Sequence, residues 1–248
     1  MCHTLETPFH WWSPSIIGNA TIQPATSVRN LGVLMDRDLS LRSHITRLTG
    51  ACFRDLRQAR AIRRSVTTDA SRMLISSTVL SRIDYCNCIF SELPDFNLDR
   101  LQQVMNAAAR VISRRRKYDH KADVLQDLHW LRVPQRIEFK LCLMVYKALH
   151  NLAPSYLAEL CIPVTAVAAR QQLRSSSTGI LVVPKPRSEF GKCAFAFAGP
   201  YAWNNLPETI KSLTSVAVFK KHLKTHLFRQ CYDILEYVAA LYKLANTN

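Results

Sequence analysis

Two apolar segments separated by a proline-containing break constrain the fold of this chain most. They lie between Ser81 and Lys117. The break is Leu93-Pro94-Asp95, where proline prevents a helix from continuing and aspartate favours a turn or a cap. Apolar side chains of the second segment recur at helical spacing: Leu98, Leu101, Val104, Met105, Ala108, Val111 and Ile112. Four cations follow at the negative end of the helix dipole, so the pattern predicts an amphipathic helix over residues 97–114 with a basic end.

Composition and periodicity predict a largely helical protein. The 248 residues include six glycines and eleven prolines, and 48% are hydrophobic, which argues for one or two globular domains and against a barrel or sandwich. Further helices are predicted over residues 43–64, 69–83, 121–128, 134–150, 155–160, 215–228 and from there to about 244. Thr67-Thr68-Asp69, Pro134 and Ser155 are expected to begin three of them. Short strands are predicted over residues 15–17, 20–22, 28–35, 180–183 and 193–197.

The predicted fold class is mainly α with minor β. A helical bundle is expected after a short N-terminal β-hairpin, followed by a small α+β C-terminal domain. The expected divisions are residues 1–42 with the short strands, 43–160 as the helical domain, 161–178 as a linker and 179–248 as the C-terminal domain. Trp130 and Trp203 are expected to be core anchors rather than surfaces on which bases stack.

The net charge of +15 is unevenly placed, since residues 41–120 carry +8 and residues 161–248 carry +7. Charge of this size indicates a polyanionic partner, because each neutralised phosphate releases condensed counterions. A solvated basic surface and an anionic membrane are the alternatives. No apolar run approaches the roughly 18 residues of a membrane span, so we expect no membrane insertion.

Three groups of cations are the candidate nucleic-acid-binding residues. In the 43–64 helix, Ile45, Leu48, Cys52, Leu56 and Ala59 share one sector of the helical wheel. Arg47, Arg54 and Arg57 lie nearly opposite, flanked by Arg60 and Arg64, and such a row can follow a phosphate backbone. The second group is Arg114, Arg115, Arg116 and Lys117, and the third is Lys220, Lys221 and Lys224. In each group the alternative is a set of solvated helix residues.

Metal and catalytic motifs are weak in this sequence. His222 and His226 have i, i+4 spacing, but no cysteine pair with zinc-finger spacing precedes them, and Cys86-Asn87-Cys88 is isolated. The cysteines lie in apolar helical patterns or singly, and no secretory signal is apparent, so a reduced intracellular location, nuclear or cytoplasmic, is expected. We expect no metal, no cofactor and no small-molecule substrate.

Several long strings point to one family. "SRIDYCNCIFSELP" followed by "RLQQVMNAAARVI" resembles the region downstream of the polymerase core in reverse transcriptases of non-LTR retrotransposons, the jockey-like LINEs. Residues 21–45 are similar to the end of that family's palm, residues 128–160 to its helices after the thumb, and residues 173–228 to its C-terminal domain. The resemblance covers most of the chain in the family's order. It implies that residues 43–160 form a thumb-like bundle that lies along a template-primer duplex.

The catalytic residues of that family have no counterpart here. Its polymerases use an Asp-Asp hairpin and a third aspartate to hold two metal ions, and this chain has no adjacent Asp-Asp pair. The fingers and most of the palm would precede Met1. The expected function is therefore that of a catalytically inactive fragment of an RNA-directed DNA polymerase that binds RNA or DNA. A helical protein-interaction module or a non-functional retroelement remnant is the alternative, and polymerase activity would need a palm from another chain.

Overall fold

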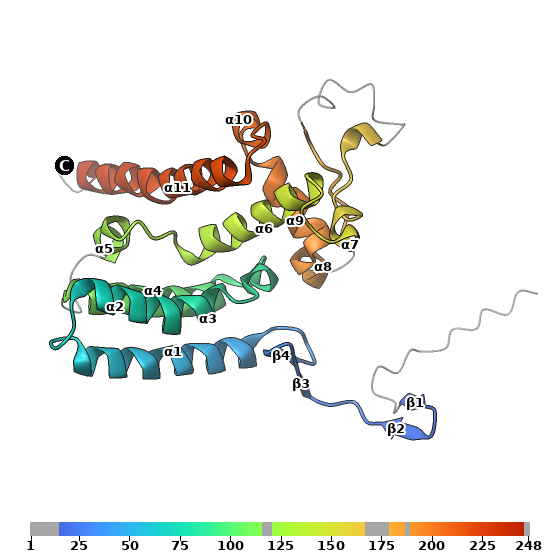
Figure 1. Ribbon diagram of the computed structural model, residues 1–248, viewed down its shortest axis with the longest axis horizontal. Helices are drawn as coiled ribbons and strands as arrows, with labels where there is room; N and C mark the ends of the chain where they lie inside the picture. The colour runs from blue at the N-terminus through green and yellow to red at the C-terminus, as the bar shows by residue number, and fades with distance from the viewer. Residues whose placement is uncertain (1–14, 116–120, 167–178, 187–188, 246–248) are drawn as a thin grey trace, which may run out of the picture. The chain divides into compact units, whose positions relative to one another are not determined.

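The computed structural model describes residues 15–115, 121–166, 179–186 and 189–245 and is mainly helical, with short hairpins near its N-terminus (Figure 1). This confirms the predicted fold class of mainly α with minor β. The chain divides into two compact units, Met1–His44 and Ile45–Asn248. The division falls inside the first helix, so the second unit contains nearly all of the helical residues.

The first unit contains two antiparallel hairpins. Their strands are β1 (Ser15–Ile17), β2 (Ala20–Ile22), β3 (Ser27–Asn30) and β4 (Val33–Asp36). The first pair was predicted, but the single strand predicted over residues 28–35 is wrong. Leu31 and Gly32 both have positive φ and turn the chain back on itself. Two successive positive φ values are typical of a tight type I′ turn, in which glycine is strain-free.

Asp36 holds the loop that leads from β4 into the first helix. Its carboxylate accepts hydrogen bonds from the Ser40 hydroxyl (2.8 Å) and from the Leu41 backbone N–H (2.9 Å). Partial burial acts to raise the pKa of Asp36, but these hydrogen bonds outweigh it and lower the pKa below its ordinary value. Asp36 therefore serves the local structure of this loop.

The long predicted helix is α1 (Arg42–Ile62). Its buried side chains include all five residues of the predicted apolar sector: Ile45, Leu48, Cys52, Leu56 and Ala59. Burial raises the pKa of the Cys52 thiol to about 11, which suits a small buried hydrophobe and not a reactive thiol. The opposite side of the helix is exposed, as predicted.

Three helical segments then follow one another directly. They are α2 (Thr68–Ile75), the π-helical turn η1 (Ser76–Leu80) and α3 (Ser81–Asp84), with the 3₁₀ turn η2 (Asn87–Phe90) after them. The predicted cap is confirmed, since the Thr67 hydroxyl accepts a hydrogen bond from the Ala70 N–H (3.2 Å). Asp84 is ion-paired with Arg136, whose Nε donates to Asp84 Oδ1 over 2.7 Å, and this pair ties α3 to α6 (Val133–Leu149).

The break at Pro94 is confirmed, because α4 (Asp95–Ser113) begins directly after it. Of its predicted apolar side chains, Leu98 is half-buried and the others are buried. After α5 (Lys121–Asp127), α6 begins with Pro134 in its first turn, as predicted. The cap predicted at Ser155 is wrong: Pro154 is extended, so Ser155 already lies in the first turn of α7 (Ser155–Ala158), and no side chain caps this helix.

The strand predicted over residues 193–197 is also wrong, because these residues belong to α8 (Glu189–Cys193) and α9 (Phe195–Asn204). The alternation Phe-Ala-Phe at 195–197 has the period of two that is typical of a strand. Beyond it, Ala198, Ala202 and Trp203 repeat at helical spacing and are buried. The helix packs against α6, and Gly199 permits the close approach, since a Cβ there would lie 3.1 Å from a methyl group of Val145.

The strand predicted over residues 180–183 is reduced to one antiparallel bridge between Pro163 and Leu181 in the described part of the chain. The side-chain amide of Asn204 bonds to both the N–H and the carbonyl of Leu181, each over 2.9 Å, and so takes the place of a neighbouring strand. Trp203 Nε1 donates to the Gly179 carbonyl (2.9 Å), and both Trp203 and Trp130 are buried as core anchors. The predicted linker holds the turn η3 (Val164–Ala166), and its residues 167–178 lie outside the described residues.

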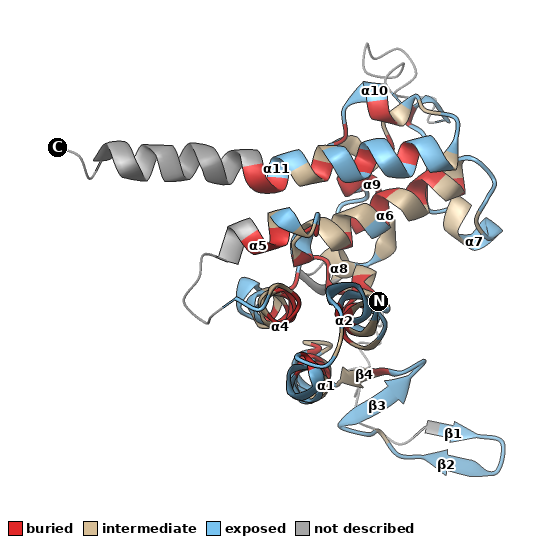
Figure 2. Ribbon diagram, turned by 60° about the vertical axis from the view of Figure 1, so that its left-hand side comes forward, coloured by how far each residue is buried: buried red, intermediate tan, exposed pale blue. Residues whose placement is uncertain are grey.

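The two helices predicted at the C-terminus are one, α11 (Val216–Ala245), which follows α10 (Glu208–Lys211). Phe219 is buried and stacks on Tyr146 of α6 at a ring-centroid distance of 4.1 Å, whereas the neighbouring Val218 is 42% exposed. The Tyr232 hydroxyl donates to the Trp130 carbonyl over 2.7 Å. Figure 2 shows buried residues of α6, α9 and α11 where these helices approach one another. The domain boundaries predicted at 160 and 178 stay predictions.

Candidate nucleic-acid interface

The helices α1 and α4 run side by side in the same direction. Near their first turns, the Arg100 guanidinium of α4 donates to the Thr46 hydroxyl of α1 over 3.0 Å. At the other end, Arg63, directly after α1, bonds to the carbonyls of Val111 and Ile112 in the last turn of α4. Figure 2 shows both helices nearly end-on. Because they are parallel, their C-terminal ends, where the sequence concentrates arginines, lie together.

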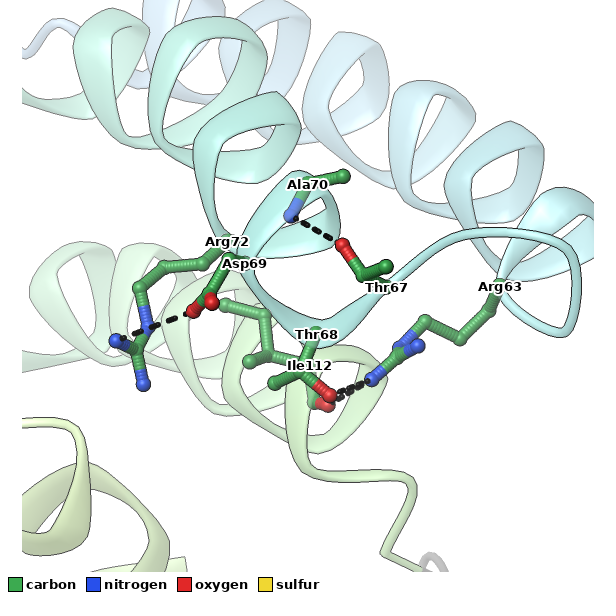
Figure 3. A network of polar contacts seen from close by, with 7 residues as sticks. All are labelled: Arg63, Thr67, Thr68, Asp69, Ala70, Arg72 and Ile112. Atoms are coloured by element: carbon green, nitrogen blue, oxygen red, sulfur yellow. Dashed lines mark hydrogen bonds and ion pairs between the residues drawn. The ribbon is translucent and has the colours of Figure 1, made fainter.

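Arg63 holds these two ends together and is only 5% exposed (Figure 3). Its Nε donates to the Val111 carbonyl (3.0 Å) and its Nη2 to the Ile112 carbonyl (2.7 Å). The same guanidinium donates to the Val66 carbonyl and the Thr68 hydroxyl, each over 3.1 Å. The last carbonyls of a helix have no partner within it, so Arg63 satisfies buried acceptors that would otherwise stay unpaired.

A hollow of about 590 Å³ lies between α1 and α4, and we call it the arginine groove. Its apolar lining consists of Phe53, Leu56, Ala107 and Val111. Its cationic lining consists of Arg57, Arg60, Arg63, Arg110, Arg114 and Arg115. These arginines come from both helices and from the residues just after them, so the groove combines apolar surface with converging guanidinium groups.

Acidic side chains hardly offset these cations. Among the described residues, the one ion pair that reaches the groove joins Arg115 to Asp127 of α5 over 3.2 Å. Both side chains are substantially exposed, and such pairs contribute at most about 1 kcal/mol. The described ion pairs leave Arg57, Arg60 and Arg110 without an acidic partner. A cleft lined by one sign of charge focuses the electric field and attracts the opposite charge.

Compensation of the helix dipoles is the alternative reason for cations at these helix ends. Arg60 and Arg110 lie in the last turns of α1 and α4 and can serve this role. However, Arg63 already bonds to the terminal carbonyls of α4, and Arg57 lies more than one turn from the end of α1. Burial, together with repulsion from the Arg114 cation, lowers the pKa of Arg63. The groove therefore holds more positive charge than the two helix ends need, and a bound anion would relieve the repulsion.

The structure brings together part of the predicted site and separates the rest. Arg57, Arg60, Arg114 and Arg115 line the groove. Arg47, Arg54 and Arg64 are exposed on and just after α1 but do not line it. Arg116 and Lys117 lie outside the described residues. Lys220, Lys221 and Lys224 are exposed on α11, and Lys224 lines a different hollow of about 490 Å³ together with Arg136 and Lys140.

Four groove residues were not predicted from the sequence: Phe53, Arg63, Ala107 and Arg110. The sequence does contain a signal for Arg63, because it follows Ala59 by four residues and Leu56 by seven, which places a cation on the buried side of the helix. An arginine in that position needs buried acceptors. No comparable signal marks Phe53 or Arg110, because their role depends on how α1 and α4 pack.

Metal and membrane sites are not apparent in the part of the chain that the structure describes. No three His, Cys, Asp or Glu side chains there gather closely enough to hold a metal ion, and no described helix combines the length and the apolarity that crossing a bilayer requires. No family model, curated protein or solved structure matches the chain.

Proposed function

We propose that this chain binds RNA or DNA through the arginine groove, with phosphate oxygens on the guanidinium groups and little sequence preference. The observation that carries the proposal is the convergence of arginines from two parallel helices on one hollow, where the described residues supply one acidic partner, the exposed Asp127. Guanidinium groups form paired hydrogen bonds with phosphate oxygens, and such contacts position a nucleic acid without reading its sequence. Gathering these charges destabilises the folded protein through self-repulsion, and a bound polyanion would relieve that repulsion.

The exposed arginines outside the groove extend this surface along α1. Arg47, Arg54 and Arg64 are solvent-exposed, and Arg57 lies between them in sequence and also lines the groove. A duplex backbone lying along α1 would meet these side chains at successive turns of the helix. This arrangement suits the template-primer duplex that the family resemblance implies. We assign the α11 lysines a smaller share of the binding free energy, because they come from one helix and do not line the groove.

We further propose that the chain is a fragment of a LINE-type reverse transcriptase and has no polymerase activity of its own. The strings that resemble this family occur in the family's order, which supports this origin of the chain. The lack of an adjacent Asp-Asp pair supports the absence of polymerase activity. Purified protein should fail to extend a primer with Mg²⁺ or Mn²⁺ on any template. Metal-dependent extension by protein free of other polymerases would refute this part of the proposal.

Binding is tested by fluorescence anisotropy with a labelled duplex and a labelled RNA–DNA hybrid at several salt concentrations. Phosphate-dominated binding should lose affinity linearly in log[salt], with a slope near −0.9 for each phosphate neutralised on B-DNA. Two duplexes of unrelated sequence should bind alike. Absence of binding at about 50 mM salt, or affinity that does not change with salt, would contradict the proposal.

A further inference from the structure

The apolar lining of the groove is not explained by phosphate binding. Phosphate contacts need donors and cations, whereas Phe53 presents an aromatic ring and is 38% exposed. Of the other apolar residues in the lining, Leu56 and Val111 are buried and Ala107 is half-buried with only a methyl side chain, so Phe53 is the large apolar side chain of the groove that a ligand can reach. Exposed aromatic surface in a concave site is typical of a surface that a ligand covers.

Phe53 and two of the arginines lie along one stripe of α1. Arg57 follows Phe53 by four residues and Arg60 follows it by seven, spacings that place side chains on the same helix face. Arg110 and Arg114 line the groove from the α4 side. A planar group resting on the Phe53 ring would therefore have guanidinium groups nearby on both helices, where its phosphates could bind.

We propose that the arginine groove holds an unpaired base stacked on Phe53, with the flanking phosphates on Arg57, Arg60 and Arg110; this inference rests on the proposed nucleic-acid binding. A base within a duplex presents its edges to the grooves, while its faces are covered by its neighbours. Away from the ends of a duplex, an unpaired base exposes a face to an aromatic ring and a paired base does not. Proteins that bind single strands combine a positive groove with such a ring, and every base has a suitable face, so sequence tolerance is retained.

The size of the hollow fits this ligand. Its volume of about 590 Å³ lies within the range of roughly 300–1,000 Å³ that is typical of pockets for small organic ligands, a class that includes a single nucleotide. The preferred substrate is then a single strand or a duplex with an unpaired end, held by the groove at the unpaired nucleotide and by the remaining arginines of α1 along the backbone.

The inference is tested with two single-stranded oligonucleotides of equal length, one normal and one with abasic sites throughout. Both carry the same phosphates, so their salt slopes should agree, but the normal strand should bind about 5- to 100-fold more tightly. Phe53→Ala should remove this difference and leave the salt slope unchanged. Phe53→Leu keeps an apolar side chain without an aromatic face and should also remove the difference in affinity. This second variant keeps the test valid if the alanine variant does not fold. Phe96→Ala, a 49%-exposed phenylalanine in the first turn of α4, is the matched control and should keep the full difference.

Failure of this inference can be distinguished from failure of the proposed function. If both strands bind with a steep salt slope but equally tightly, or if the Phe53 variants keep the difference, then the base-stacking inference is overturned while nucleic-acid binding stands. If neither strand nor any duplex binds at about 50 mM salt, both are overturned.

Discussion

The arginine groove and the lysine face of α11 both carry exposed cations in the second unit, but they present them differently. In the groove, arginines from α1 and α4 surround one hollow of about 590 Å³. On α11, Lys220 and Lys221 are exposed on a single helix that packs against α6, and Lys224 lines the separate hollow with Arg136 and Lys140 of α6. Six arginines from two helices and the residues just after them line the groove, whereas Lys220 and Lys221 do not line the hollow that Lys224 reaches.

Within the groove region, adjacent arginines also have different roles. Arg63 is buried and bonds to backbone carbonyls, whereas Arg64, the next residue, is exposed. The first fixes the ends of α1 and α4 relative to each other, and this packing forms the groove. The comparison therefore separates the residue that builds the site from those that would contact the ligand, and each can be tested alone.

The largest effect on stability is expected for Arg63→Ala. It leaves the carbonyls of Val66, Val111 and Ile112 without this donor, and unsatisfied buried polar groups cost about 1–3 kcal/mol each, partly offset by water entering the space. We expect the free energy of unfolding to fall by about 3 kcal/mol in urea titrations. Arg64→Ala is the matched control and should change it by no more than about 0.5 kcal/mol. Equal, small effects of the two variants would show that Arg63 does not hold the groove together.

Two charge-matched double variants of α1 separate groove arginines from outer arginines. Arg57→Gln with Arg60→Gln should weaken duplex binding on the order of 20-fold at about 50 mM salt, with a salt slope lower by up to about two units. Arg47→Gln with Arg54→Gln changes the same charge on the same helix and should have a smaller effect. Both pairs are exposed, so circular dichroism should show unchanged helix content. A larger loss from the outer pair would place the binding surface outside the groove.

The helix α11 is held by a buried hydrogen bond of its own, which can be tested separately from the groove. Tyr232→Phe removes the hydroxyl that donates to the Trp130 carbonyl, and loss of one buried hydrogen bond should lower the free energy of unfolding by about 1 kcal/mol. Tyr201, which is 49% exposed on α9, provides the control substitution to phenylalanine, expected to change stability by less than about 0.5 kcal/mol. Nucleic-acid binding should stay unchanged in Tyr232→Phe, and a loss of binding in the folded variant would link α11 to the site.

The helices were largely predictable from the sequence because each has a local signal. The apolar sector of α1, the break at Pro94 and the cap at Thr67 depend on residues a few positions apart, and all three are confirmed. The errors at residues 193–197 and 180–183 occur where distant contacts decide the structure. The helix α9 packs through Gly199 and small residues against α6, and Asn204 replaces a neighbouring strand for Leu181. Alternating Phe and Ala residues cannot reveal either contact.

The groove was predictable only in part, for the same reason. Periodicity identified exposed arginines on α1 and a basic end of α4, but the parallel packing of these helices determines which of them converge. That packing depends on Arg63, which contacts residues 48 and 49 positions away in the sequence. It also brings Phe53 and Arg110 to the hollow, although neither stands out in its own segment.

The central claim is that nucleic acid binds at the groove and not simply wherever the protein is positive. It is tested most directly by comparing the salt dependence of duplex binding for two triple variants that each remove three charges: Arg57→Gln, Arg60→Gln, Arg110→Gln and Lys220→Gln, Lys221→Gln, Lys224→Gln. We expect the slope of log K against log[salt] to fall by up to about three units for the arginine variant and by less than about one for the lysine variant. Equal falls, or a larger fall for the lysine variant with both proteins folded, would contradict the account.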